Sequence, residues 1–268
     1  MLRSTIVRAP ITRSVFRPAQ PRRFPPGLRR VLLWLLLAAL LVALVLVAWD
    51  RANNPQSLAE SALAGPRKVN GAVCVEEAVD ISGSMGAFRE QREAAERALF
   101  TFAQRELHPD DRFSAAFFAG SAGLGLPPTP MSALASAPSV PPGIAFDGTR
   151  LAPAVRTLVQ ARPADDGCAA RALIVITDGE IFDNPQALSD ALTSAGYTRV
   201  FAVIPTAAGF SRPDALPESI DVLHFHGGGL WGEVVSLFSD AQPLDVVFGE
   251  VLAEVTGQQL VQNRGGDS

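Results

Sequence analysis

The sequence predicts an α/β domain built on a doubly wound, mostly parallel sheet with helices on both faces, preceded by one transmembrane helix. Three observations lead to this prediction: strand and helix patterns that alternate from residue 67 onward, a continuous apolar strand at residues 172–177, and an unbroken apolar run at residues 31–49. Alternating strands and helices favour a parallel sheet with helical crossovers. A strand without polar residues is typical of one buried on both faces of such a sheet.

The apolar run at residues 31–49 contains 19 uncharged residues, with Trp34 and Trp49 near its ends. At ~1.5 Å per residue, a helix of this length spans roughly the ~30 Å hydrocarbon core of a bilayer. A cleaved signal peptide is the alternative, but its apolar region would be about 7–15 residues long and followed promptly by a cleavage site. The nearest small-x-small site, Ala62 to Ala64, comes only after the charged pair Asp50-Arg51. We therefore expect an uncleaved single-pass anchor.

The charge of the chain changes sign at this run. The 268 residues sum to −4, but residues 1–49 contain eight arginines and no acid, which leaves −12 for the remainder. By the positive-inside rule, residues 1–30 form a cytoplasmic tail and the chain from Asp50 onward lies in the extracellular or periplasmic space. The acidic outer part argues against nucleic acid as a partner. We expect a linker over 50–66, the domain over 67–260 and a polar tail over 261–268.

The first half of the domain begins with a β-rich run at residues 73–81. Residues 87–106 then place Phe88, Ala95, Leu99 and Phe102 on one stripe of a helix, with charged residues elsewhere. A second apolar strand follows at residues 113–118. Residues 120–147 are rich in Gly, Pro, Ser and Ala, which indicates loops with one short edge strand.

The second half repeats the alternation. A helix is predicted directly after Thr149, and the continuous apolar strand at residues 172–177 follows it. The remaining pattern indicates a helix over 185–195, strands over 200–204 and 220–225, and a last helix over 241–256. In a doubly wound sheet of this kind, ligands bind at the carboxyl ends of the strands.

Oxygen-bearing side chains gather where predicted strands end and a helix begins. Asp80, Ser82 and Ser84 follow the first strand, Asp178 follows the long apolar strand, and Thr149 precedes a helix. Carboxylates and hydroxyls are ligands for Mg²⁺, Mn²⁺ or Ca²⁺ rather than for zinc. Two carboxylates with neutral hydroxyls leave one coordination position for water or for an acidic group of a partner.

These three clusters resemble the metal-ion-dependent adhesion site (MIDAS) of von Willebrand factor A (VWA) domains, and the resemblance covers roughly residues 68–258. It implies that Ser82 and Ser84 contact the metal directly and that Asp80 does so through water. Thr149 and Asp178 would contact it directly or through water. It also implies a protein partner whose Glu or Asp completes the coordination.

Three functions are compatible with parts of this pattern. The first, which we prefer, is a bacterial, membrane-anchored, outward-facing module that binds a protein partner through Mg²⁺ or a similar cation and is not an enzyme. The second, implied by the same resemblance, is a subunit that works with an AAA-type ATPase, although such an ATPase would be cytosolic. The third is a Mg²⁺-dependent hydrolase with Asp80 as nucleophile. It would need an acid at position 82, which is Ser82, and a nearby lysine, whereas Lys68 lies twelve residues earlier.

Two further features stay open at this point. Cys74 and Cys168 fall in neighbouring predicted strands, and they form either a disulfide or free buried thiols. With both strands in register the two residues would be offset by ~13 Å. Glu76 and Glu77 lie inside the first strand, where a buried carboxylate needs a partner or a proton. One of them is expected to pair with an arginine or to reach solvent, and a second functional carboxylate cluster is the alternative.

Overall fold

A computed structural model describes residues 31, 33–42, 45, 55–206, 216–226 and 242–263. The chain forms two units, Met1–Asp50 and Arg51–Ser268. In the first unit, residues 31, 33–42 and 45 of the predicted anchor are helical, and the rest of that segment and the predicted tail over 1–30 lie outside the described residues. Within the described part of the chain, no helix is long and apolar enough to cross a membrane.

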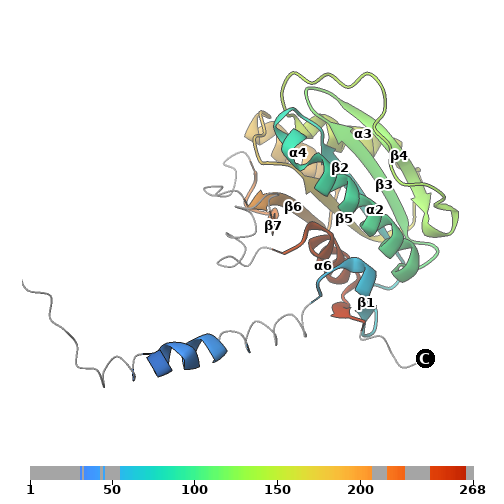
Figure 1. Ribbon diagram of the computed structural model, residues 1–268. Helices are drawn as coiled ribbons and strands as arrows, with labels where there is room; N and C mark the ends of the chain where they lie inside the picture. Colours follow the sequence, from blue (N-terminus) through green and yellow to red (C-terminus); the bar gives the residue numbers. More distant parts are fainter. Residues whose placement is uncertain are drawn as a thin grey trace, which may run out of the picture. The chain divides into compact units, whose positions relative to one another are not determined.

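The second unit is built on a six-stranded sheet with the order β4-β3-β2-β5-β6-β7 (Figure 1). All neighbouring strands are parallel except β3 and β4, so the prediction of a mostly parallel sheet is confirmed. The antiparallel strand β4 contains prolines, which edge positions tolerate. The strands are β2 (Ala72–Asp80), β3 (Arg112–Phe118), β4 (Ala122–Pro130), β5 (Cys168–Ile176), β6 (Arg199–Thr206) and β7 (Asp221–His226).

Helices cover both faces of this sheet (Figure 1). One buried cluster joins Leu99 and Phe102 of α2 (Arg89–Glu106) with Phe248 of α6 (Leu244–Thr256). A second cluster on the other face joins Leu151 of α3 (Leu151–Ala161) with Leu188 of α4 (Pro185–Ala195). Two short 3-10 helices, η2 (Ser84–Phe88) and η3 (Met131–Ala133), follow β2 and β4 in the chain.

The direction of winding reverses between β2 and β5. From β2 the chain passes through α2 to β3 on one side, and it later reaches β5 on the other side of β2 through α3. The loops that leave the carboxyl ends of β2 and β5 therefore diverge. A crevice at such a switch point is where open α/β sheets bind their ligands.

The predicted linker over 50–66 needs a correction. Residues Leu58–Glu60 form the 3-10 helix η1, and Ser61–Ala64 form β1, which pairs with β8 (Gln259–Gln262) in a small antiparallel sheet. Leu58 is 1% exposed, because it packs into the same buried cluster as α2 and α6. The domain therefore begins before residue 67 and extends beyond residue 260. Strands of four residues are too short to show a period-two pattern.

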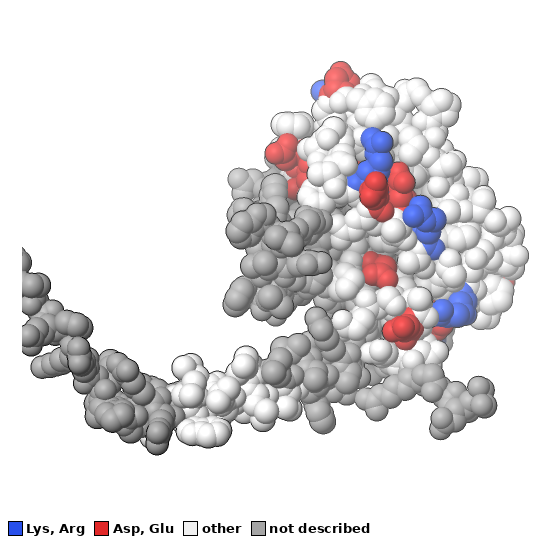
Figure 2. Space-filling view, in the orientation of Figure 1, with Lys and Arg blue, Asp and Glu red and all other residues white. Residues whose placement is uncertain are grey.

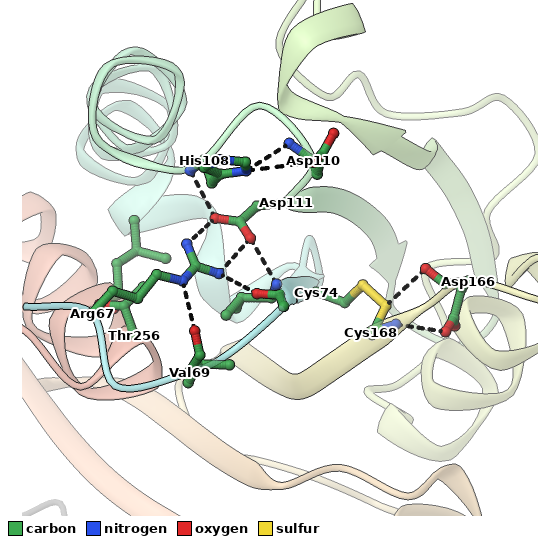
Figure 3. A network of polar contacts seen from close by, with 12 residues as sticks. Arg67, Val69, Cys74, His108, Asp110, Asp111, Asp166, Cys168 and Thr256 are labelled. Carbon is green, nitrogen blue, oxygen red and sulfur yellow. Dashed lines mark hydrogen bonds and ion pairs between the residues drawn. A yellow bond between two sulfur atoms is a disulfide. The ribbon is translucent and has the colours of Figure 1, made fainter.

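The start of β2 is fixed by two cross-links (Figure 3). The buried carboxylate of Asp111 accepts two hydrogen bonds from Arg67, both of 2.6 Å, and one of 2.7 Å from the Val73 amide. Beside this ion pair, Cys74 and Cys168 form a disulfide with their Cα atoms 5.8 Å apart. Of the two alternatives for the cysteines, the structure has the bonded one.

The register of β2 and β5 explains why the bond forms. Val79 lies opposite Ile176, whereas Ala72 lies opposite Cys168, so β5 contains one extra residue between these points. The expected offset of ~13 Å assumed that Asp80 and Asp178 lie opposite each other at the ends of the two strands. In the structure, the pairing of Val79 with Ile176 and the bulge place Cys168 opposite Ala72, only two residues before Cys74.

The two glutamates of β2 have opposite surroundings. Glu76 faces α3 and α4, where its carboxylate pairs with Arg162 at 2.8 Å and Arg171 at 2.6 Å and accepts a 2.7 Å hydrogen bond from Tyr197. The expected pairing with arginine is thus confirmed for Glu76. Glu77 is buried on the other face, and its Oε1 accepts no hydrogen bond from the described residues.

Candidate metal centre

The first cluster of the candidate site is a tight turn at the end of β2. Asp80 is fully buried, and its Oδ1 accepts a 2.8 Å hydrogen bond from the amide of Ser82. This bond folds the chain back, so the hydroxyls of Ser82 and Ser84 come within 3.1 Å of each other. The turn thus directs two hydroxyls to one point beside a buried carboxylate.

The second cluster follows β5 and is bonded directly to the first. Thr177 donates a 2.8 Å hydrogen bond from its hydroxyl to Oδ2 of Asp80. Gly179, at φ 89°, allows the turn that follows, and its amide donates a 3.1 Å hydrogen bond to the Thr177 hydroxyl. Asp178 is buried, and its Oδ1 accepts a 3.1 Å hydrogen bond from the amide of Glu180.

Thr149, the third predicted position, lies in a loop that backbone hydrogen bonds connect to both neighbouring loops. Its carbonyl accepts a 2.9 Å hydrogen bond from the amide of Phe182, in the loop after β5. The amide of Arg150 donates a 2.8 Å bond to the carbonyl of Ala119, just past β3. Asp183 then caps α3, since its carboxylate accepts bonds from the first amides of that helix.

All five predicted residues therefore lie on three connected loops at the carboxyl ends of the strands. Ser82 is hydrogen-bonded to Asp80, the charge of Asp178 acts on the Asp80 carboxyl, and the backbone of Thr149 is hydrogen-bonded to the loop that follows Asp178. Sequence reasoning missed Thr177, whose partner is 97 residues away, and Arg92, whose guanidinium donates a 2.8 Å bond to the carbonyl of Asp80.

The electrostatics of the site favour a cation. Burial raises the pKa of the Asp80 carboxyl, hydrogen bonds from Ser82 and Thr177 oppose this, and the charge of Asp178 raises the pKa further. Among the described residues, no Arg, Lys or His forms an ion pair with either carboxylate. Two neighbouring buried carboxylates without a counter-charge repel each other, and a bound cation would remove that repulsion.

The donor set fits a hard divalent cation. In the part of the chain that the structure describes, no three His, Cys, Asp or Glu side chains are placed to hold a metal together. Beside the two carboxylates, hydroxyls would have to supply further ligands to a cation. Neighbouring ligands of an octahedral ion with ~2.1 Å bonds lie about 3 Å apart, and the 3.1 Å between the Ser82 and Ser84 hydroxyls is compatible with that spacing.

The chain is similar to known proteins in its fold. No protein-family model matches the chain, and no curated protein matches it. An aerotolerance-related membrane protein from Bacteroides fragilis is 19% identical, with 69% of this chain and 100% of that chain covered and a TM-score of 0.44. A von Willebrand factor type A protein from Catenulispora acidiphila is 18% identical, with 74% and 48% covered and a TM-score of 0.49.

Proximal thread matrix protein 1 from the mussel byssus, whose structure is described with a zinc-occupied MIDAS motif, is 15% identical. Its alignment covers 76% of this chain and 50% of that chain, with a TM-score of 0.47. Solved structures similar to this chain thus include VWA domains, and the chain spans about half the length of two of them. At identities below 20%, the role of each residue has to come from the chemistry of this chain.

Proposed function

We propose that the domain is a VWA-type binding module that holds a divalent cation, with Mg²⁺ preferred, through Asp80, Ser82, Ser84, Thr149 and Asp178. The neighbouring buried carboxylates of Asp80 and Asp178, which form no ion pair with any of the described residues, are the observation that carries this proposal. A bound cation would supply an electrophilic point at the surface. An acidic residue of a protein partner would complete its coordination.

Each residue of the proposed site has a different role. Ser82 and Ser84 offer hydroxyls, and Ser84 is exposed, so the metal position is open to a partner. Thr177 and the Ser82 amide occupy one lone pair on each oxygen of Asp80 and hold that carboxylate in place. Asp178 contributes the second negative charge. The hydrogen bonds among the three loops keep these donors arranged before a ligand arrives.

Binding rather than catalysis is the activity we propose. In the hydrolase alternative, Asp80 would attack a substrate, but this carboxylate is fully buried and both its oxygens accept hydrogen bonds. A nucleophile needs an accessible lone pair and a base or charge that activates it. Figure 2 shows acidic and basic side chains interspersed on the face in view, without a continuous basic area, which supports a protein partner over nucleic acid.

We also propose that residues 31–49 anchor the chain in a cell membrane, with the tail inside and the domain outside. The described helical residues of this segment expose their apolar side chains, including Trp34 at 71% and Leu36 at 68%, which a bilayer would cover. The disulfide between Cys74 and Cys168 favours an oxidising compartment. Both features oppose the alternative of a cytosolic ATPase partner.

Titration calorimetry of the detergent-solubilised full-length chain tests the metal site. We expect one Mg²⁺ or Mn²⁺ per chain, and a loss of about 100-fold or more in affinity for Asp178→Asn and Ser82→Ala. Asp165→Asn, a change at an exposed acid outside the site, is the control and should bind as wild type. If the site variants also bind metal as wild type, the assignment is wrong.

Two further measurements test the partner and the topology. A pull-down with the full-length chain should recover a protein in Mg²⁺ and lose it in EDTA. A topology reporter fused after residue 268 should report the outside of the membrane. A cytoplasmic signal would refute the outward orientation and would favour the ATPase-partner alternative.

A further inference from the structure

Three large apolar side chains of the described domain are exposed. Val140, Phe146 and Phe182 are 51%, 65% and 67% exposed, and the other exposed large hydrophobic side chains among the described residues belong to the segment 31–45. We call these three residues the apolar collar. Soluble domains rarely gather exposed aromatic side chains without a use, and such patches mark interaction sites.

The apolar collar lies next to the loops of the candidate metal centre. Phe146 lies three residues before Thr149, and the amide of Phe182 donates its hydrogen bond to the Thr149 carbonyl. Val140 and Phe146 line one cavity together with Ser82. All three collar residues therefore border loops that carry proposed metal ligands.

The loops that carry the collar are held by hydrogen bonds. The carbonyl of Phe146 accepts a 3.1 Å bond from the Gly148 amide, and the preceding Ala145 is bonded through its amide to Ser121 at 2.8 Å and through its carbonyl to Gly120 at 2.8 Å. The loop of Phe182 is bonded to that of Thr149. Aromatic side chains on fixed loops lose little conformational entropy when a partner covers them, which is the property of a preorganised interface.

The cavity beside the metal loop has room for one side chain. Its volume is about 230 Å³, below the ~300–1,000 Å³ of sites for small-molecule ligands. Ile81 and Met85 supply apolar walls, and Val140 and Phe146 supply the collar side. The charged side chains of the lining are Arg89, Arg92 and Glu93, so the basic ones outnumber the acidic one. This combination suits an apolar side chain next to a negative group.

From these observations we infer that the partner presents an acidic residue directly beside a bulky apolar residue. The carboxylate would reach the cation, and the apolar side chain would enter the cavity between Val140 and Phe146. Phe182 would cover the adjoining part of the partner segment. This inference rests on the proposed function, since the cation selects the acid, and it adds the collar as the second determinant of specificity.

Selection of random peptides tests the inference. Phage-displayed peptides are bound to the detergent-solubilised full-length chain in Mn²⁺ and eluted with EDTA. We expect enrichment of Asp or Glu next to Phe, Leu or Trp. A synthetic peptide from the selection should lose about tenfold or more in affinity with Phe146→Ser or Phe182→Ser, each of which removes an apolar contact. Because both side chains are exposed, neither change should affect folding or Mg²⁺ affinity.

The controls separate this inference from the proposed function. Thr193→Ala, at an exposed position of α4, should bind the peptide as wild type. If peptides elute with EDTA but show no apolar preference, or bind both collar variants as wild type, the collar inference is wrong and the metal function stands. Failure to bind Mg²⁺ at all would instead refute the proposed function.

Two other occupants give different results. If the wild-type chain dimerises in Mn²⁺ and Phe146→Ser abolishes the dimer, the collar binds a second copy and the inference is wrong. If phospholipid vesicles displace the peptide but not the metal, the collar binds lipid, which also refutes it. If Mg²⁺ binds and no peptide elutes with EDTA, the partner is not recognised through such a segment.

Discussion

The hydroxyl of Thr177 at the end of β5 donates a 2.8 Å hydrogen bond to Oδ2 of Asp80 at the end of β2. This bond joins the two strands on either side of the topological switch point. The Thr177 hydroxyl also accepts the amide of Gly179 and so aligns the turn that presents Asp178. Thr177 thus positions both carboxylates without being a proposed ligand.

Replacing Thr177 by valine should weaken metal binding while leaving the fold intact. Valine preserves the shape of threonine but cannot donate to Asp80, and loss of such supporting bonds typically costs about 10–100-fold in metal affinity. Calorimetry with Mn²⁺ measures the change. Thr101→Val, on the exposed face of α2, is the matched control. Wild-type affinity in Thr177→Val would show that the bond does not position the carboxylates.

Metal should stabilise the domain against unfolding. A ligand that binds the folded state alone adds about 2.7 kcal/mol at a concentration 100 times its dissociation constant. We expect thermal unfolding of the full-length chain to move to higher temperature as Mg²⁺ is added, and not to move for Asp178→Asn. A shift of equal size in both proteins would mean that Mg²⁺ acts elsewhere on the chain.

The parts of the fold that position the site were predictable because they carry strong patterns. The strand at residues 172–177 is uniformly apolar, and the helix predicted over 185–195 matches α4. The three polar clusters are local in sequence, so their place at strand ends followed from the strands themselves. Features that depend on distant contacts were not predictable.

The missed features illustrate this limit. The role of Thr177 depends on a partner 97 residues away, and the exposure of Phe146 and Phe182 depends on how loops pack. Strand β1 consists of four residues whose pairing with β8 spans nearly the whole domain. The offset between Cys74 and Cys168 depended on a bulge in β5, for which the sequence carries no signal.

Reduction of the disulfide should lower the stability of the domain. The bond closes a loop with a sequence separation of 94 residues. Constraint of the unfolded chain by a loop of this size is worth about 3–5 kcal/mol. Urea unfolding with and without a reductant, repeated on Cys74→Ala/Cys168→Ala, measures the effect. The double variant should unfold at the lower urea concentration with or without reductant, and identical midpoints for oxidised and reduced wild type would contradict the prediction.

Glu96 should make stability fall as the pH rises. Burial raises its pKa to about 7 from the ordinary 4.5, against the opposing effect of Arg92. Between these values the folded state binds more protons than the unfolded state, so the free energy of unfolding decreases with increasing pH. Glu96→Gln should flatten this slope between pH 5 and pH 7. Glu90→Gln, at an exposed position of the same helix, should retain it, and equal slopes in all three proteins would refute the assignment.

The same substitution should have opposite consequences at Glu76 and Glu77. Glu76→Gln removes the counter-charge of Arg162 and Arg171, whose side chains are each 13% exposed, and should cost about 3–5 kcal/mol. Burial and the charge of Glu96 raise the pKa of Glu77 well above its ordinary value, which favours the neutral form of this side chain. Glutamine has a similar shape and no charge, so Glu77→Gln should cost little stability at pH 5. At pH 8 the same substitution should increase stability, because keeping Glu77 protonated in the folded state costs free energy at that pH. Urea unfolding of both variants at the two pH values measures the contrast, and a similar loss for both at pH 8 would show that Glu77 is ionised and paired.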